Sequence, residues 1–295
     1  MKRVKISKEA AMRLRQTIRL SPLFLGVGWA LAAALNTACV FDLDGDWFEG
    51  FGGREYTQDF QKTLPLPSDG RFSLKNTNGF VHVSTWNRDE VEVRAKKIAR
   101  RRESDLDLVK VEVESLSDAV RVDTVYERHR NIRVSVNYEV KVPEGCRLEL
   151  VRSTNGDLEL AGRFGEVQAG TTNGDIRLDS AEGGAALSTT NGTIRAYGVR
   201  GGVTADTTNG DVVLELGEFS GEVRADTTNG SIKLRLPGEP NARLVARTTN
   251  GSIRTDIPVT VEGGSNSRRR LEGTLGKGGP TISLETTNGS ITISR

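Results

Sequence analysis

The chain has 295 residues, a formal net charge of +2, two cysteines and 33 glycines, and only 5% of its residues are aromatic. This length allows one large repeat domain or two ordinary domains, and two cysteines exclude a fold built on a disulfide framework. The first 38 residues hold seven basic residues and one acidic residue, so residues 39–295 carry a net charge of −4. That balance excludes the basic surface expected of a nucleic-acid-binding domain, and we expect no nucleic-acid partner.

Residues 1–38 have the organisation of a secretion signal. Seven Lys and Arg residues precede an apolar run from Pro22 to Leu35. This run is shorter than the ~20 residues that cross a bilayer as a helix, and it suits the apolar centre of a signal peptide. Met12 is an alternative start that would shorten the basic lead.

The signal ends in Thr37-Ala38-Cys39, which resembles the lipobox of bacterial lipoproteins and makes Cys39 the predicted lipid attachment site. Asn36 departs from that pattern, because an apolar or small residue is usual there. Cleavage near Ala38 without lipidation and retention as an uncleaved anchor therefore stay open. All three alternatives place the rest of the chain outside the cytoplasm, in the cell envelope, with a lipid anchor as the predicted link to the membrane.

Residues 39–66 are rich in Gly and Asp, and we expect them to form a tether between the anchor and the folded body. Asp42, Asp44 and Asp46 alternate as in a calcium loop, but the glutamate that closes an EF-hand loop is replaced by Gly53.

Residues 67–295 contain eight copies of a block in which Thr-Asn-Gly or a close variant leads into a short apolar strand. The asparagines are Asn78, Asn155, Asn173, Asn191, Asn209, Asn229, Asn250 and Asn288. They recur every 18 residues from Asn155 to Asn209, and then at 20 and 21. A fixed period of this size indicates stacked supersecondary units.

Each block alternates apolar and polar residues, and the apolar positions change parity across Asn-Gly. Val203 and Ala205 lead into Asn209, whereas Val212 and Leu214 follow it. Alternation of period two predicts strands with one buried face, and a change of parity predicts a corner between two strands. The glycine at this corner is attributed to a positive φ angle.

Two architectures fit this corner. We predict an all-β, right-handed parallel β-solenoid with coils of 18–21 residues, in which identical residues stack at the strand spacing of roughly 4.8 Å. Residues 67–295 would then form roughly 12 coils at that period, with the 77-residue gap before Asn155 filled by irregular coils. The alternative is an antiparallel meander or sandwich in which each Asn-Gly is a hairpin turn.

Four features together resemble one known family. They are the strand from Trp86 to Val91, the Val-Pro-Glu-Gly of residues 142–145, the serial Thr-Asn-Gly blocks, and a Gly-rich loop before the last block. The chain resembles the bacterial β-strand-repeat proteins catalogued as adhesin-like domains of unknown function, also called Toastrack-type domains. The resemblance implies a solenoid-like fold, an envelope location and, in some relatives, links to envelope-stress signalling, and it implies no catalytic residues.

Candidate groups for catalysis are few. Asp157, Asp175 and Asp211 share the column after Gly, and a spacing of roughly 5 Å between adjacent coils is near the carboxylate separation of retaining glycosidases. A polysaccharide-acting enzyme using Asp157 and Asp175 is therefore an alternative. His82 and His129 lack metal-ligand spacing, so we expect neither a metal nor a cofactor.

Two further features are interpreted structurally. Alternation around Cys146 predicts a small buried side chain rather than a reactive thiol. The Thr preceding each Asn should face outward and form a row of hydroxyl and methyl groups. Its members are Thr77, Thr154, Thr172, Thr190, Thr208, Thr228, Thr249 and Thr287.

We therefore expect a non-catalytic, envelope-associated module that presents repeated Thr, Asn and Asp columns to an envelope protein or a glycan. A partner domain in envelope-stress signalling is a second alternative.

Overall fold

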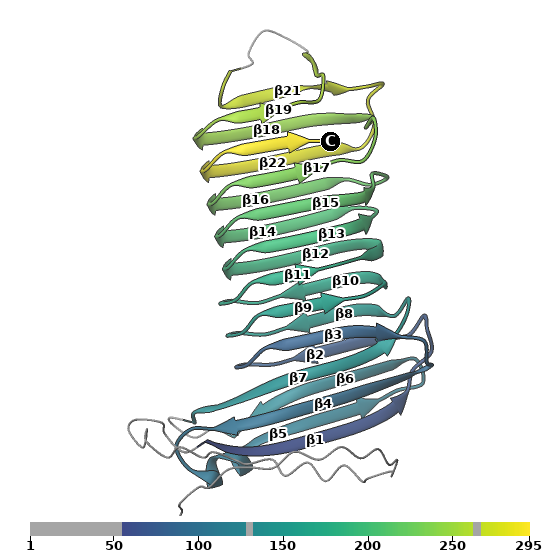
Figure 1. Ribbon diagram of the computed structural model, residues 1–295, viewed down its shortest axis with the longest axis vertical. Helices are drawn as coiled ribbons and strands as arrows, with labels where there is room; N and C mark the ends of the chain where they lie inside the picture. The colour runs from purple at the N-terminus through teal and green to yellow at the C-terminus, as the bar shows by residue number, and fades with distance from the viewer. Residues whose placement is uncertain (1–54, 128–131, 262–266) are drawn as a thin grey trace, which may run out of the picture. The chain divides into compact units, whose positions relative to one another are not determined.

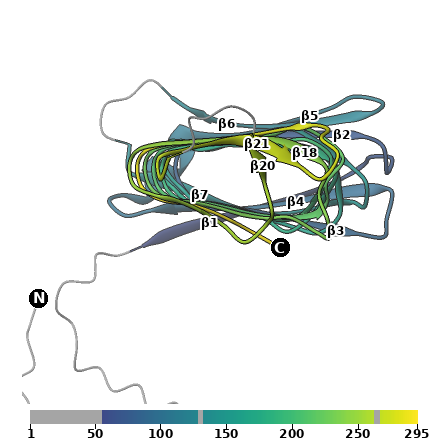
Figure 2. The ribbon, with the colours of Figure 1, turned by 90° about the horizontal axis from the view of Figure 1, so that it is seen from above.

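The computed structural model describes residues 55–127, 132–261 and 267–295, which belong to one compact unit. Within this unit the strands stack in two facing ladders (Figures 1 and 2). The side chains between the ladders form the core. The proposed signal, Cys39 and His129 lie outside the described residues.

The first ladder begins with two strands that run antiparallel to their neighbours and continues as a parallel stack. In spatial order it consists of β1 (Tyr56–Pro65), β4 (Glu90–Ala99), β7 (Val134–Pro143), β3 (Val81–Trp86), β9 (Leu158–Ala161), β11 (Ile176–Leu178), β13 (Ile194–Arg200), β15 (Val212–Glu218), β17 (Ile232–Arg235), β23 (Ile291–Ser294) and β19 (Ile253–Thr255).

The second ladder is parallel in its centre and antiparallel at both ends. In spatial order it consists of β5 (Val109–Ser115), β6 (Ala119–Tyr126), β2 (Arg71–Lys75), β8 (Arg147–Arg152), β10 (Phe164–Gly170), β12 (Ala181–Asn191), β14 (Val203–Asn209), β16 (Val223–Asn229), β22 (Thr281–Asn288), β18 (Ala242–Asn250), β21 (Arg270–Leu275) and β20 (Thr260–Val261). A short 3-10 helix, η1 (Glu103–Leu108), connects β4 to β5 and buries Leu106.

One strand of each ladder and the corner between them make one coil of the solenoid. In spatial order the described coils are β6–β7, β2–β3, β8–β9, β10–β11, β12–β13, β14–β15, β16–β17, β22–β23 and β18–β19. Parallel pairing in register, for example Ile176 with Ile194 and Ile194 with Val212, confirms the parallel solenoid and excludes the Asn-Gly hairpins. The nine coils are fewer than the twelve predicted, because part of the chain forms antiparallel strands at the two ends.

The inner face of each coil carries the apolar residues that alternation predicts. Val203, Ala205, Val212 and Leu214 are all fully or almost fully buried. The same positions in adjacent coils pair in register, so aliphatic side chains stack in columns along the stack. Stability in such an array comes mainly from contacts between neighbouring coils.

Glycine at the corner is required both by its φ angle and by close stacking. The φ angle of Gly192 is +155°, which confirms the predicted positive φ. A Cβ atom on Gly192 would lie 1.9 Å from the carbonyl oxygen of Gly174 in the adjacent coil. The glycines of consecutive coils therefore stack too closely for any side chain.

The folded body begins earlier than the boundary at residue 67 that the sequence suggests. Tyr56–Pro65 forms β1, which pairs along its whole length with β4, and Leu66 is 1% exposed. Tyr56, Phe60 and Leu64 pack against the core at every fourth position. This spacing hides the alternation that marks a strand, so the sequence predicts a tether where residues 56–66 belong to the folded body.

Candidate functional site

The corner of the solenoid carries the repeated polar residues. In six of the eight motifs the first residue is a Thr that faces inward, and its hydroxyl donates to a glycine carbonyl of the adjacent coil. Thr207 donates to Gly192 over 3.0 Å, and Thr227 donates to Gly210 over 2.9 Å. Thr171, Thr189, Thr248 and Thr286 make the same bond. This buried column links the coils to one another.

The asparagines form a continuous ladder of side-chain hydrogen bonds. From Asn155 onward, each amide nitrogen donates to the amide oxygen of the asparagine that precedes it along the stack, over 2.7–2.9 Å. The spatial order is Asn78, Asn155, Asn173, Asn191, Asn209, Asn229, Asn288 and Asn250. The structure therefore brings all eight predicted residues together, with Asn288 between Asn229 and Asn250. Hydrogen bonds in such a chain polarise and strengthen one another.

The Asp column has a structural task as well. Asp157 Oδ1 accepts the backbone N–H of Asp175, and Asp175 Oδ1 accepts that of Thr193, each over 2.8 Å. The second oxygen of Asp175 pairs with Arg195 at 3.0 Å. Asp211 accepts the N–H of Ser231 in the same way. Each of these carboxylates therefore bonds to the backbone of the coil above it.

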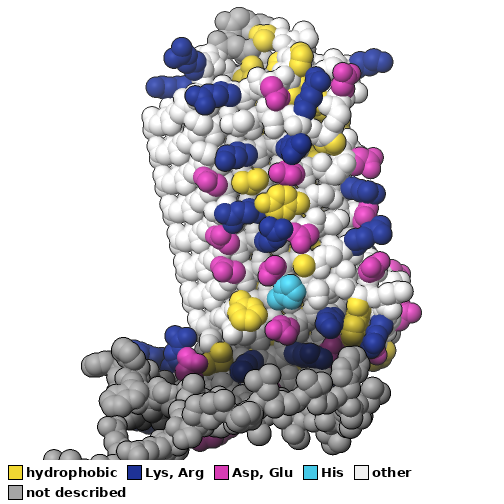
Figure 3. Space-filling model, in the orientation of Figure 1, with side chains coloured by type: hydrophobic (Ala, Val, Ile, Leu, Met, Phe, Trp, Pro, Cys, Tyr) yellow, Lys and Arg dark blue, Asp and Glu magenta, His cyan; other side chains and the backbone are white. Residues whose placement is uncertain are grey.

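The outward Thr column is a single file beside the Asn ladder, and its members are exposed or half-exposed. Figure 3 shows this edge of the stack as a strip with neither charged nor hydrophobic side chains. The adjoining face carries acidic and basic side chains interspersed, for example Arg177 and Asp179 at 2.9 Å. Neither surface concentrates one sign of charge.

The cysteine and the histidine of the described chain both have structural surroundings. Cys146 is buried, as predicted, and burial raises the pKa of its thiol to about 12, so it is a thiol at neutral pH. His82 is half-buried on the outer face, with Nδ1 3.3 Å from Glu159 Oε2. Within the described residues, no group of three His, Cys, Asp or Glu side chains could hold a metal ion.

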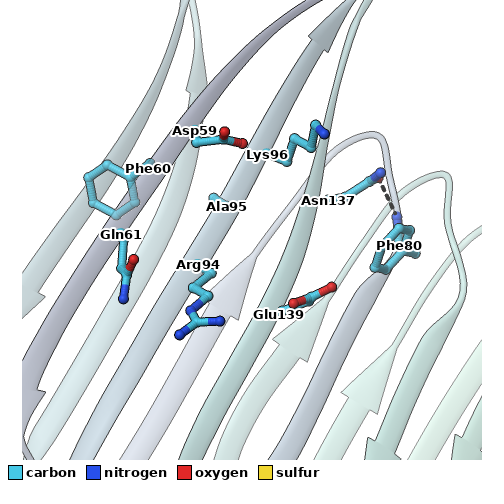
Figure 4. A pocket seen from close by; sticks show the side chains of 9 residues that line it. All are labelled: Asp59, Phe60, Gln61, Phe80, Arg94, Ala95, Lys96, Asn137 and Glu139. Carbon is cyan, nitrogen blue, oxygen red and sulfur yellow. Dashed lines mark hydrogen bonds between the residues drawn. The ribbon is translucent and has the colours of Figure 1, made fainter. Parts of the chain in front are cut away.

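One residue breaks the repeat at the surface. Phe80 stands in the column that holds Asp, Thr or Ser in the other seven blocks, and it is 44% exposed. Its backbone N–H donates to Asn137 Oδ1 over 3.3 Å (Figure 4), whereas the equivalent N–H groups of Asp175, Thr193 and Ser231 donate to a carboxylate. The signal for Phe80 in the sequence is its departure from this column, which appears only when the eight blocks are compared.

Phe80 lines a groove of about 350 Å³ on the outer side of β1, β4 and β7 (Figure 4). Lys96 lies opposite Asp59 and Arg94 lies opposite Glu139 in the strand register, so charges of both signs alternate across it. A smaller hollow of about 250 Å³ shares Arg94 and Glu139 with this groove and extends to His82. Aromatic carbon, amides, carboxylates and a guanidinium group therefore meet on one exposed surface.

The fold and its corner define an all-β repeat protein of the parallel solenoid class. The family model described as Toastrack DUF4097 matches residues 63–294. The chain therefore belongs to the Toastrack DUF4097 family, as its motifs predicted.

Comparison with solved structures gives distant similarities. A candidate adhesin from Bacteroides fragilis is 12% identical, with 81% of this chain and 97% of that chain covered and a TM-score of 0.36. A candidate lipid-binding protein from Parabacteroides distasonis is 9% identical, with coverages of 80% and 97% and a TM-score of 0.30. A candidate cell adhesion protein from Clostridium sporogenes is 11% identical, with coverages of 80% and 99% and a TM-score of 0.30. No curated protein matches the chain.

Among the residues that the structure describes, no helix has the length and apolar character to cross a membrane.

Proposed function

We propose that the protein is a non-catalytic interaction module of the bacterial envelope, held to a membrane by a lipid on Cys39. Its ligand in this proposal is an envelope glycan, bound at the groove beside Phe80. The observation that carries the proposal is the contrast between the repeat and its exception. The repeated Thr, Asn and Asp side chains hold the coils to one another, whereas Phe80 is exposed and replaces a small polar turn residue.

The chemistry of the groove suits a sugar ring. An exposed aromatic ring can pack against the apolar face of a pyranose, and side-chain amides and charged groups can bond its hydroxyls. Asn137 uses its Oδ1 for the backbone of Phe80, which leaves its two N–H donors for a ligand. Pockets for small molecules combine apolar surface with a few placed polar groups in this manner.

The non-catalytic part of the proposal rests on the Asp column. Asp157 and Asp175 each bond to the backbone of the next coil, which explains their position without a reaction. Replacing either residue by Asn should leave glycan binding unchanged. The variants and the wild type should also show the same rate of hydrolysis of any glycan that the protein binds. A hydrolytic activity that disappears in the Asp157→Asn or Asp175→Asn variant would establish the enzyme alternative.

The binding site is tested by replacing Phe80 with the residue that other coils carry at the same position of the repeat. Phe80→Ser introduces the residue that the β16–β17, β18–β19 and β22–β23 coils carry at this position, so the fold should tolerate it. Leu116→Ser is the matched control, because Leu116 is a 53% exposed side chain in the turn between β5 and β6. On a panel of envelope glycans, Phe80→Ser should bind at least tenfold more weakly than the wild type, and Leu116→Ser should bind as the wild type does.

Equal binding by both variants would refute this assignment of the groove.

The anchor is tested separately by mass spectrometry of the envelope-derived protein, in which a diacylglycerol on Cys39 is the expected result. An unmodified Cys39, or a mature chain that begins after Ala38 without lipid, would refute the anchor and leave the groove untouched.

A further inference from the structure

The last block of the chain does not lie at the end of the stack. β16–β17 is followed in the sequence by β18–β19, yet the two coils are not neighbours. β22 lies between β16 and β18, and β23 lies between β17 and β19 (Figure 1). The chain therefore leaves a slot one coil high, and its final segment, residues 281–295, fills that slot.

The backbone of this C-terminal block is bonded on both sides. On one side, the N–H of Gly230 donates to the carbonyl of Asn288 over 3.0 Å. On the other side, the N–H of Gly289 donates to the carbonyl of Asn250 over 3.2 Å. Both walls of the slot thus present strand edges, which are binding sites for an added strand.

Side chains make the slot selective. Asn288 donates to Asn229 over 2.8 Å and accepts from Asn250 over 2.9 Å. Thr286 donates to the carbonyl of Gly230 over 2.8 Å. Ile282, Leu284, Ile291 and Ile293 enter the core and are buried. A segment that fits must combine this alternation with Thr, Asn and Gly at the corner.

The slot is also distinguished in the sequence. The occupant and both walls carry the same six residues, Thr-Thr-Asn-Gly-Ser-Ile, at positions 286–291, 227–232 and 248–253. Each of the other five blocks has a different residue within this stretch. Ser290 lies between Ser231 and Ser252, with its N–H 3.3 Å from Ser231 Oγ and its Oγ 3.4 Å from the N–H of Ser252.

The connection between β17 and β18 spans the slot and comprises residues 236–241. Between positions of equal register, Ile232 and Leu244 are 12 residues apart, whereas Val212 and Val223 in the preceding coil are 11 apart. One additional extended residue reaches about 3.3 Å, which is less than the strand spacing of about 4.8 Å, so the connection crosses the slot by its path more than by its length. Pro237 and Pro240 restrict the connection, because proline fixes φ.

The block is joined to the rest of the chain by an exposed Gly-rich turn. Residues 276–280 cross the end of β18 to connect β21 with β22, and Gly276 and Gly278 adopt φ angles of +54° and +77°. The backbone N–H of Lys277 donates to Asn241 Oδ1 over 2.7 Å, and Lys277 is itself exposed. This turn is the covalent link between the block and the strands that precede it.

We propose that the slot between the β16–β17 and β18–β19 coils is a peptide-binding site for a strand pair of this pattern, and that a second copy of this chain can supply it through its own C-terminal block. An identical block fits the slot with the same bonds, so exchange between copies alters only the path of the turn at residues 276–280. Such an exchange would link two copies without any new interface.

The site is tested on the whole chain with a protease recognition sequence inserted between Lys277 and Gly278. After cleavage, circular dichroism should show an intact β fold, and a fluorescent peptide of residues 278–295 should exchange into the slot at one per chain. The matched control is the same peptide with Gly289→Ala, because the added Cβ would lie 2.0 Å from the carbonyl oxygen of Gly230. We expect its affinity to be at least tenfold lower.

Three outcomes would each overturn the binding site: equal affinity of the two peptides, absence of exchange with the wild-type peptide in excess, or unfolding upon cleavage.

Exchange of the C-terminal block between two copies of the chain is tested by deleting Gly278 and Gly279, which leaves three residues to cross β18. Shortened hinges favour swapping, so light scattering should show dimers that excess peptide 281–295 converts to monomers. A variant that stays monomeric would overturn exchange between copies. Neither assay depends on the glycan or the lipid anchor.

Discussion

The buried hydroxyl column can be tested at Thr207, whose Oγ1 donates to the carbonyl of Gly192 over 3.0 Å. Thr207→Val keeps the shape of the side chain and removes only this donor. A buried neutral hydrogen bond contributes about 1 kcal/mol, and leaving its acceptor without a partner costs about 1–3 kcal/mol. Because Gly192 is half-exposed, we expect the free energy of unfolding to fall by about 1–2 kcal/mol, in the lower part of that range.

The structure provides a matched control at Ser153, which occupies the same column. Its Oγ is buried and has no hydrogen-bond partner, because Asn76 Nδ2 lies 3.2 Å from Gly79 O, the carbonyl that Ser153 would otherwise use. Ser153→Ala should therefore change the free energy of unfolding by less than about 0.5 kcal/mol, or raise it. Both variants are measured by urea unfolding followed by circular dichroism. Equal losses, or no loss in Thr207→Val, would refute the role assigned to the Thr–Gly bonds.

Three further predictions concern other positions in the stack. In the folded protein, burial and then the charge of Asp226 raise the pKa of Asp206 above its usual value of 3.8. Protonated Asp206 therefore favours the folded protein, and the free energy of unfolding falls as pH rises from 3.8 to the raised pKa. Asp206→Asn should thus unfold at higher urea than the wild type at pH 7, with the difference vanishing below about pH 3.8; a constant difference would contradict this. Gly192→Ala should cost about 3 kcal/mol or more, because its Cβ would lie 1.9 Å from Gly174 O, and a soluble variant of wild-type stability would refute the close stacking. Cys146 should resist thiol reagents at pH 8 in the folded protein and react after unfolding, and rapid labelling of the native protein would contradict its burial.

The repeat made the central part of the fold predictable. Positions such as Val203, Ala205, Val212 and Leu214 show strict alternation around one Asn-Gly, and a period of 18 favours a stack in which like residues meet over a series of Asn-Gly hairpins. The Asn ladder follows from the same argument, because one amide per coil at strand spacing can bond to the next. The features of the corner that were hardest to predict concern contacts between coils, such as the close approach of Gly192 to Gly174.

The two ends of the stack were less predictable. β1, β4 and β5 have no counterpart in the repeat, and nothing local shows that they run antiparallel to their neighbours. The place of Phe80 was visible as a departure from its column, but the groove beside it depends on Arg94, Asn137 and Glu139, which come from strands far apart in the sequence. A groove formed by separate strands has no signature in any one of them.

The amino-acid sequence alone determined the class of fold, the corner and the stacking of the asparagines, because each depends on a pattern that recurs within one period. Only the tertiary structure decided the order of the coils, in which residues 281–295 lie between two coils that are consecutive in the sequence. The physical reason is that the three coils concerned carry the same Thr-Thr-Asn-Gly-Ser-Ile, so local bonding is equally satisfied by either order. The antiparallel pairing of β21 with the other edge of β18 leaves the slot as the place where the last block can stack on β18.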